Sequence, residues 1–279
     1  MIKRFIVSGI VVFFLSAIPA SVIPQFTPEE LAQRAKIEDI LLKGEILHWK
    51  EVGIGVTKPL RMHVRLGDRE ISGIWKDPSA GDSDFHEGWR HEIAAYRLDD
   101  HLGVGMIPPT VERRFRMRKG SFQYWVEGLT TKRALNSEDR EIPEDRQDAC
   151  DRRQRLANAF DCLIANIDRT QENIAYTADW RVILLDHSRA FRTHNFYVDQ
   201  LVYGDKGMSR KPIAPLPRNF VERLRGLDAK TIRTSVGKYL NPKEIQAVLK
   251  RRDLILDELD ELIRKHGEDA VFYESPAGS

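Results

Sequence analysis

Short stretches in which apolar and polar residues alternate dominate the first half of the chain. Three of them, EILHWKEV, LRMHVRL and EISGIWK, are separated by the segments GIGVTKP and GDR. Alternation with a period of two, bounded by such turn residues, predicts β-strands joined by turns. A further hairpin is predicted where IPPTVERRFRM and SFQYWVEG flank the turn RKG. Between these pairs of strands, FHEGWRHEIAAYRLDDHLG has helical spacing and ends near Gly103.

After about residue 130 the pattern becomes helical. Apolar residues recur at spacings of three and four over 138–167 and again over 217–267. This order predicts an α+β chain with a small β-rich lobe that contains one helix, followed by a larger, mostly helical lobe. The segment VEGLTTKR is the predicted joint between them. The predicted units are an N-terminal helix (25–43), the small lobe (44–130), the larger lobe (131–270) and a tail (271–279).

The first 24 residues differ from the rest of the chain. Lys3 and Arg4 precede an apolar run that begins at Phe5, and small residues follow it. A basic start, an apolar middle and a small-residue exit are typical of a secretory signal peptide. If the apolar stretch extends to Ile23, it approaches the roughly 20 residues that a membrane-spanning helix needs. We therefore expect residues 1–24 to be a signal peptide or a membrane anchor, and the protein to be exported (periplasmic or secreted) or anchored to the membrane.

The amino-acid composition and the net charge exclude few classes of function. The 279 residues are 42% hydrophobic and 31% charged, which is typical of a globular protein large enough for two lobes. The net charge of +2 gives no electrostatic reason to expect nucleic acid as a partner. Cys150 and Cys162 lie on one predicted helix, about 18 Å apart. A disulfide needs Cα atoms within about 7 Å, so two free thiols are predicted.

Candidate chemistry is concentrated in LIANIDRTQENIAYTADWRVILLDHSRAF. IAYT and RVILL, joined by the turn ADW, predict a hairpin with Asn173 before its first strand and Asp186 after its second. Pairing of the strands brings these two side chains to one end, near Asp168, which lies five residues before Asn173 at the end of the preceding predicted helix. A carboxylate and an amide oxygen suit Mg²⁺, which leaves Asp168 to orient a hydroxyl for phosphoryl transfer. Alternatively, Asp168 caps a helix and the other two are ordinary turn residues.

The small lobe contains two groups that a phosphoryl-transfer site requires. EISGIWK ends in Lys76, and in the next helix Glu92 shares a stripe with Trp89, Ile93 and Tyr96. A carboxylate on an apolar face is costly to bury without a partner, so an ion pair between Lys76 and Glu92 is predicted. The alternative is that Glu92 lies at the edge of the stripe and reaches water.

A glycine-containing turn between the first two strands is a candidate phosphate-binding loop. Gly53 and Gly55 allow the backbone of VGIGVTKP to approach an anion closely, and Thr57 and Lys58 add hydrogen-bond donors. By itself such a turn is usually only a turn. It precedes Lys76 by one pair of strands, where the phosphate-covering loop of a kinase lies.

Together these segments resemble the atypical kinases of the phosphatidylinositol 3/4-kinase-like superfamily, in particular its bacterial branch, which is similar to the secreted Fam20-type kinases. The resemblance covers most of residues 44–267 and rests on the order of VGIGVTKPLRMHVRL, ISGIWKDPSAG, HEIAAYRLDDHLGVGMIPPTV, GSFQYWVEG, NIDRTQEN and LLDHSRAF. It implies a two-lobed protein-kinase-like fold with ATP between the lobes. By position, the resemblance implies that Lys76 contacts the phosphates, Glu92 holds Lys76, Asp168 is catalytic, and Asn173 and Asp186 bind Mg²⁺ (or Mn²⁺).

Two motifs depart from the pattern of the lipid kinases. Thr170 stands where D-R-H-x-x-N has its histidine, and Asp186, His187 and Ser188 replace D-F-G. The sequence predicts an ATP- and magnesium-dependent kinase whose acceptor is a hydroxyl of a protein, carbohydrate or lipid. Two alternatives keep the same fold: a nucleotide-binding pseudokinase, and an enzyme that transfers AMP with the same residues. The expected partners are the nucleotide, the acceptor and, through the N-terminus, a membrane, but not nucleic acid.

Overall fold

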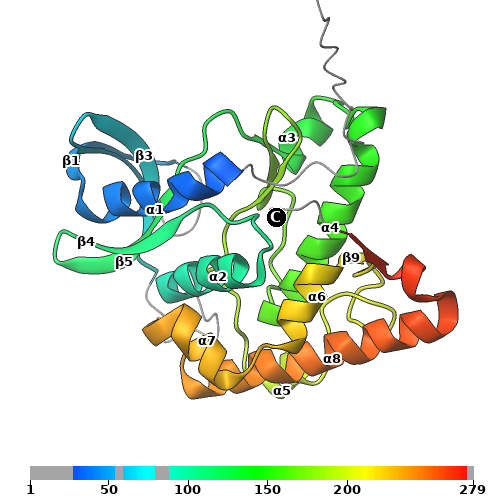
Figure 1. Cartoon of the computed structure of the whole chain (residues 1–279). Coiled ribbons are helices and arrows are strands. Elements are labelled where there is room, and N and C mark those ends of the chain that lie inside the picture. Colours follow the sequence, from blue (N-terminus) through cyan, green and yellow to red (C-terminus); the bar gives the residue numbers. More distant parts are fainter. Residues whose placement is uncertain (1–27, 54–58, 79–87, 275–279) are drawn as a thin grey trace, which may run out of the picture.

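The computed structural model describes residues 28–53, 59–78 and 88–274, which form a small β-rich lobe and a larger helical lobe (Figure 1). The segment 1–24, predicted to be a signal peptide or anchor, lies outside the described residues. Within the described residues, no helix combines the length and the apolar composition needed to cross a membrane. The small lobe is an antiparallel sheet in the order β1-β2-β3-β5-β4, with α1 packed against it. Its elements are α1 (Pro28–Lys43), β1 (Glu45–Glu51), β2 (Leu60–Leu66), β3 (Arg69–Lys76), β4 (Thr110–Phe115) and β5 (Arg118–Tyr124).

Two glycines allow β3 and β5 to pair at the end of the sheet that carries Lys76. A Cβ atom at Gly73 would lie 2.5 Å from the Phe122 ring, and one at Gly120 would lie 2.3 Å from the carbonyl oxygen of Lys76. Both distances are shorter than real Cβ contacts, so any other residue would force the strands apart. The pairing places Lys76 opposite Ser121 at the last register position of β3.

The larger lobe consists mainly of helices, and α8 runs along its base (Figure 1). A small sheet of β6, β7 and β8 packs against α3 and α4. The elements after β3, apart from β4 and β5, are α2 (Trp89–Leu102), β6 (Thr130–Thr131), α3 (Lys132–Ser137), α4 (Glu144–Ile164), β7 (Ile174–Tyr176), β8 (Val182–Leu184), α5 (Asn195–Val198), β9 (Leu216–Pro217), α6 (Arg218–Arg225), α7 (Ala229–Val236), α8 (Pro242–His266) and β10 (Phe272–Tyr273).

Helix α2 joins the two lobes. It contacts β4 and β5 of the small lobe and α6 and α7 of the larger one. Its fully buried Ile93 and Leu98 belong to the same hydrophobic cluster as Phe160 and Leu163 of α4. Because apolar packing fixes the rotation of a helix about its axis, this cluster also fixes the direction of Glu92, the neighbour of Ile93.

The helical segments predicted over 138–167 and 217–267 are interrupted where capping residues occur. Helix α4 begins only at Glu144, after Pro143. In the second segment, the Asp228 side chain caps α7, and Gly237 ends it with a φ of 70°. A capping box at Asn241 then begins α8. Such caps accept hydrogen bonds from the backbone N–H groups at the start of a new helix. The predicted segment 217–267 therefore divides into three helices, α6, α7 and α8.

Two further expectations concern the cysteines and the C-terminus. Cys150 and Cys162 are both buried free thiols, as predicted. Residues 271–279 were predicted to be a tail, but Phe272 and Tyr273 form β10, which pairs in parallel with β9. The aromatic side chain of Phe272 is buried in the hydrophobic core of the larger lobe, so this segment packs against that lobe.

Asp99 on α2 is a buried carboxylate between α1 and the loop that follows α2. Its Oδ1 accepts hydrogen bonds from the backbone N–H groups of Met106 and Ile107, at 2.9 and 3.3 Å. Arg34 Nη1 of α1 lies 3.9 Å from Oδ2. Burial raises the pKa of Asp99 from 3.8 to about 7, although Arg34 and the two N–H groups oppose this shift.

We predict that Asp99 makes the free energy of unfolding fall as pH rises from about 4 to 7. In that window the Asp99 carboxyl ionises in the unfolded chain but stays protonated in the folded one. The contribution of Asp99 to the free energy of unfolding is therefore complete in acid and is lost as pH rises through the folded pKa. Urea denaturation at pH 4.5 and 7.5 should show that Asp99→Asn lacks this loss, which amounts to roughly 2–4 kcal/mol. Parallel pH profiles for the wild type and the variant would contradict the assignment.

Candidate active site

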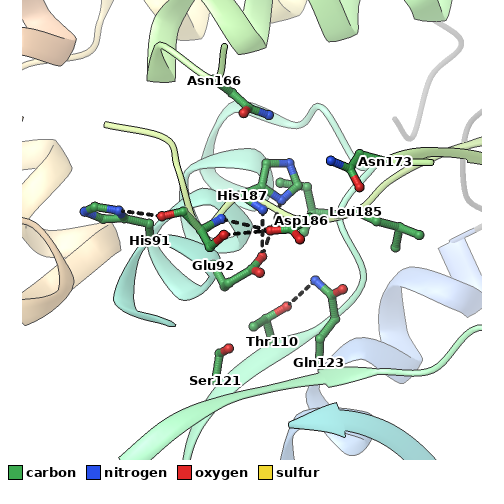
Figure 2. A network of polar contacts seen from close by, with 12 residues as sticks. His91, Glu92, Thr110, Ser121, Gln123, Asn166, Asn173, Leu185, Asp186 and His187 are labelled. Carbon is green, nitrogen blue, oxygen red and sulfur yellow. Dashed lines mark hydrogen bonds and ion pairs between the residues drawn. The ribbon is translucent and has the colours of Figure 1, made fainter. Parts of the chain in front are cut away.

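The hairpin of β7 and β8 gathers the residues that sequence reasoning placed at one end of it. Ile174 pairs with Leu184, and the N–H of Leu185 donates to the carbonyl oxygen of Asn173 at 3.0 Å. Asn173 and Asp186 therefore leave the hairpin at the same end, and Figure 2 shows both side chains there. Asp186 has a φ of 52°, a left-handed conformation that aspartate tolerates better than most residues and that often marks functional sites.

The loop that carries Asp168 is tied to this end of the hairpin. Asn173 Nδ2 donates to the carbonyl oxygen of Asp168 at 2.9 Å, so the amide nitrogen is used to fix the loop. The N–H of Asp168 in turn donates to Asn166 Oδ1 at 3.3 Å. With its main chain fixed from both sides, Asp168 keeps a carboxylate that is 37% exposed and open to a bound molecule.

Lys76 and Glu92 form the ion pair that joins β3 to α2. Lys76 Nζ lies 2.8 Å from Glu92 Oε1 and 3.4 Å from Asp186 Oδ2. The other carboxylate oxygen of Glu92 accepts the backbone N–H of His187 at 2.9 Å. Glu92, which is 2% exposed, therefore contacts both lobes through its two oxygens. Figure 2 shows Glu92 beside His187.

The electrostatics of this pair keep both groups charged. Burial by itself would lower the pKa of Lys76, but the Glu92 and Asp186 carboxylates outweigh burial and raise it above its ordinary value. Burial would likewise raise the pKa of Glu92, yet Lys76 and His187 hold it well below the usual range. A charged lysine is what a site for nucleotide phosphates needs.

Sequence reasoning missed a second buried ion pair beneath the Asp168 loop. Arg169 forms a bidentate pair with Asp161 of α4, with two N–O distances of 2.9 Å, and both side chains are almost completely buried. Arg169 Nη1 also donates to the carbonyl oxygens of Asn173 and Leu185, at 2.8 and 2.6 Å. One guanidinium thus supports both strands of the hairpin where the candidate metal ligands leave it. The available signal was Asp161, a charged residue within the apolar run FDCLIANI.

His187 connects the two ion pairs. Its Nε2 lies 2.9 Å from Arg169 Nη2, and Nδ1 lies 3.7 Å from Glu92 Oε2. Burial lowers the pKa of His187, Arg169 lowers it further, and Glu92 opposes this. The neutral ring accepts from Arg169 through Nε2 and therefore carries its proton on Nδ1, on the side of Glu92. The histidine after Asp186 thus belongs to the site's supporting network.

Arg189 is the other side chain that sequence reasoning overlooked. Its Nη1 lies 3.2 Å from Asp168 Oδ2, and both groups are partly exposed. The Asp168 carboxylate therefore has a positively charged neighbour at the candidate site.

The candidate phosphate loop is described only in part. Gly53 follows Val52, the first residue after β1, and a Cβ atom at Gly53 would meet no other atom of the described residues within 4 Å. Gly55, Thr57 and Lys58 lie outside the described residues, so their predicted role stays a prediction.

The oxygen atoms near Asp186 fit a divalent cation. Asp186 Oδ1 accepts from the Ser188 hydroxyl at 2.8 Å, which orients a carboxylate that is 40% exposed. Because Asn173 Nδ2 is used by the Asp168 carbonyl, the amide oxygen remains as the second ligand atom. No cluster of three or more His, Cys, Asp or Glu suited to a metal occurs in the part of the chain that the structure covers. A single carboxylate with an amide oxygen suits Mg²⁺, which takes its other ligands from water and phosphates.

Comparison with known proteins gives matches at the level of structure. No model of a known protein family and no curated protein matches the chain. The crystal structure of the Golgi casein kinase is similar with a TM-score of 0.62 and 16% identity, over 88% of this chain and 79% of that one. The hydra Fam20 structure with sugar gives 0.59 and 14%, over 87% and 93%. The Helicobacter pylori proinflammatory kinase CtkA gives 0.54 and 10%, over 82% and 97%.

The chain has a kinase-like fold. This confirms the predicted two-lobed architecture, and the likeness to Fam20 structures agrees with the family resemblance seen in the sequence. Membership of the phosphatidylinositol 3/4-kinase-like superfamily and of its bacterial branch stays a prediction. The Golgi casein kinase has also been crystallised with Mn/ADP bound, in a structure with a TM-score of 0.61 to this chain.

Proposed function

We propose that the protein is a phosphotransferase that uses ATP with Mg²⁺ or Mn²⁺ and transfers the γ-phosphoryl group to a hydroxyl of a protein, carbohydrate or lipid. The observation that carries this proposal is the position of Lys76 between Glu92 and Asp186, at 2.8 and 3.4 Å. A lysine held by a buried carboxylate, next to a carboxylate open to metal, forms the phosphate-binding end of a kinase-type site. The kinase-like fold and the neighbour with Mn/ADP bound support it.

Each side chain of the site has a distinct role in this proposal. Lys76 would bind the nucleotide phosphates, and Glu92 would fix the position of its ammonium group. Asp168, whose carboxylate is partly exposed, would orient the acceptor hydroxyl and take up its proton. Asn173 and Asp186 would hold the metal ion. When bound, the ion neutralises negative charge on the phosphates.

Arg189 would supply a positive charge that the Asp168 loop lacks. Thr170 and Gln171, which follow Arg169, are uncharged, and the guanidinium of Arg169 is committed to Asp161. The Arg189 guanidinium lies 3.2 Å from the Asp168 carboxylate, and both groups are partly exposed. From there it would stabilise negative charge on the phosphoryl group during transfer.

Variants of the two acidic residues test the proposal directly. Asp186→Asn should abolish the thermal stabilisation by MgATP, because it removes the carboxylate that joins metal to protein. Asp168→Asn should keep this stabilisation while turnover of γ-labelled ATP falls by about 10²–10⁴-fold. At about 100 times the dissociation constant, bound nucleotide adds roughly 2.7 kcal/mol, which a melting curve resolves.

The matched control is Asp257→Asn, which removes an exposed carboxylate from α8 and should change neither readout. Equal stabilisation in all variants, or none in the wild type, would contradict the proposal. Incubation with α-labelled ATP separates the chemistry further, because label retained on the acceptor would show AMP transfer and not phosphoryl transfer.

The role of Arg189 gives a separate prediction. Arg189→Met should lower kcat by about 10²–10³-fold, since it removes a donor that acts mainly in the transition state. The affinity for MgATP should change only a few-fold, and Arg189→Lys should recover part of the rate because it restores the charge. Steady-state kinetics with each variant measure both effects. A variant whose kcat equals that of the wild type would show that the Arg189–Asp168 contact is only structural.

A further inference from the structure

A cleft lies beside the Asp168 loop, on the side of the larger lobe. Its volume is about 310 Å³, and its walls come from α3, α4, the Asp168 loop and the segment between α5 and β9. Thr170 and Gln171, the second and third residues after Asp168, form part of its lining. The cleft therefore adjoins the loop that carries the proposed base, and none of the residues assigned above to nucleotide or metal lines it.

The cleft is strongly positive. Lys132, Arg155 and Lys211 line it, and in the described part of the chain none of the three forms an ion pair. A fourth cation in the lining, Arg169, is neutralised by Asp161. The one carboxylate in the lining is Asp151, so three cations less one carboxylate leave a net charge of +2. Lys132 and Arg155 are partly buried, which reduces the screening of their charge by water.

The cleft wall opposite the loop is fixed by hydrogen bonds. Asn158 of α4 is 3% exposed, and its Nδ2 donates to the carbonyl oxygen of Pro212 at 2.9 Å. Gln154 Nε2 donates to Asn158 Oδ1 at 3.1 Å. These bonds tie the Lys211 segment to α4, so Lys211 and Arg155 of α4 keep their spacing. A pre-formed, charged cleft loses little entropy when a ligand binds.

We propose that this cleft binds the phosphomonoester group of a small molecule, among Lys132, Arg155 and Lys211. The net charge of +2 complements a phosphate dianion, and a carboxylate would leave one charge uncompensated. The volume lies at the small end of the range for low-molecular-weight ligands, which favours a small phosphorylated compound over a macromolecule. If the proposed function holds, a hydroxyl of the same molecule would face Asp168, and the cleft would be the anionic part of the acceptor site.

The test is calorimetric titration with glucose 6-phosphate, inorganic phosphate and glucose, in the absence of nucleotide and metal. We expect both phosphates to bind and glucose not to bind. In the double variant Lys132→Met/Arg155→Met, each substitution should lower the affinity for glucose 6-phosphate by about tenfold, because each removes a charge-assisted hydrogen bond. The matched control is Lys230→Met/Arg233→Met, which removes two exposed cations from α7. Lys211→Met provides a single change on an exposed segment if the double variant does not fold.

Three results would overturn the proposal: equal loss in the control and the cleft variants, no binding of glucose 6-phosphate by the wild type, or tighter binding of a glutamate-rich peptide than of glucose 6-phosphate. The last would identify a carboxylate ligand. Because these titrations contain no ATP, their failure is distinguishable from failure of the proposed kinase function, which the MgATP melting shift reports separately.

Discussion

The contacts of Glu92 are the interaction on which the rest of the site depends. This carboxylate is buried on α2 and would be costly to leave without partners in an apolar environment. One oxygen accepts from Lys76 on β3, and the other accepts the backbone N–H of His187 after β8. A single side chain thereby fixes the distance between a strand of the small lobe and the segment that follows β8 in the larger one. Apolar packing of α2 in the large core fixes the direction in which Glu92 points.

From Glu92 the polar contacts continue into the larger lobe as a connected network. His187 lies between Glu92 and Arg169. Arg169 pairs with Asp161, and both side chains are buried. The same guanidinium donates to the carbonyl oxygens of Asn173 and Leu185, so the ends of β7 and β8 are fixed to α4. Breaking a buried pair of this kind leaves an uncompensated charge, which typically costs several kcal/mol. The positions of the candidate metal ligands thus depend on buried side chains that are not themselves candidate ligands. The network reaches Asn173 only through its backbone carbonyl oxygen.

Local patterns were sufficient to predict the parts of the site that adjacent elements bring together. The helical stripe around Glu92 and the strand that ends in Lys76 predicted their contact. The pairing of the two hairpin strands predicted that Asn173 and Asp186 would leave the hairpin at the same end. Arg169 and Arg189 were missed because their partners are set by the tertiary fold: Asp161 faces inward from α4, and Asp168 lies across a loop from Arg189. The division of the C-terminal helical segment followed from capping residues that apolar spacing alone does not weigh.

The most direct test of this account is a double-mutant cycle of Lys76→Met and Glu92→Gln, with MgATP affinity measured by calorimetry. If Glu92 acts by holding Lys76, each single change should weaken binding by a similar factor, and the double change should cost little more than either one. The coupling free energy should then be a large part of the single effects, at about 1–3 kcal/mol. Additive losses, with a coupling near zero, would show that the two groups act independently and would contradict the central claim.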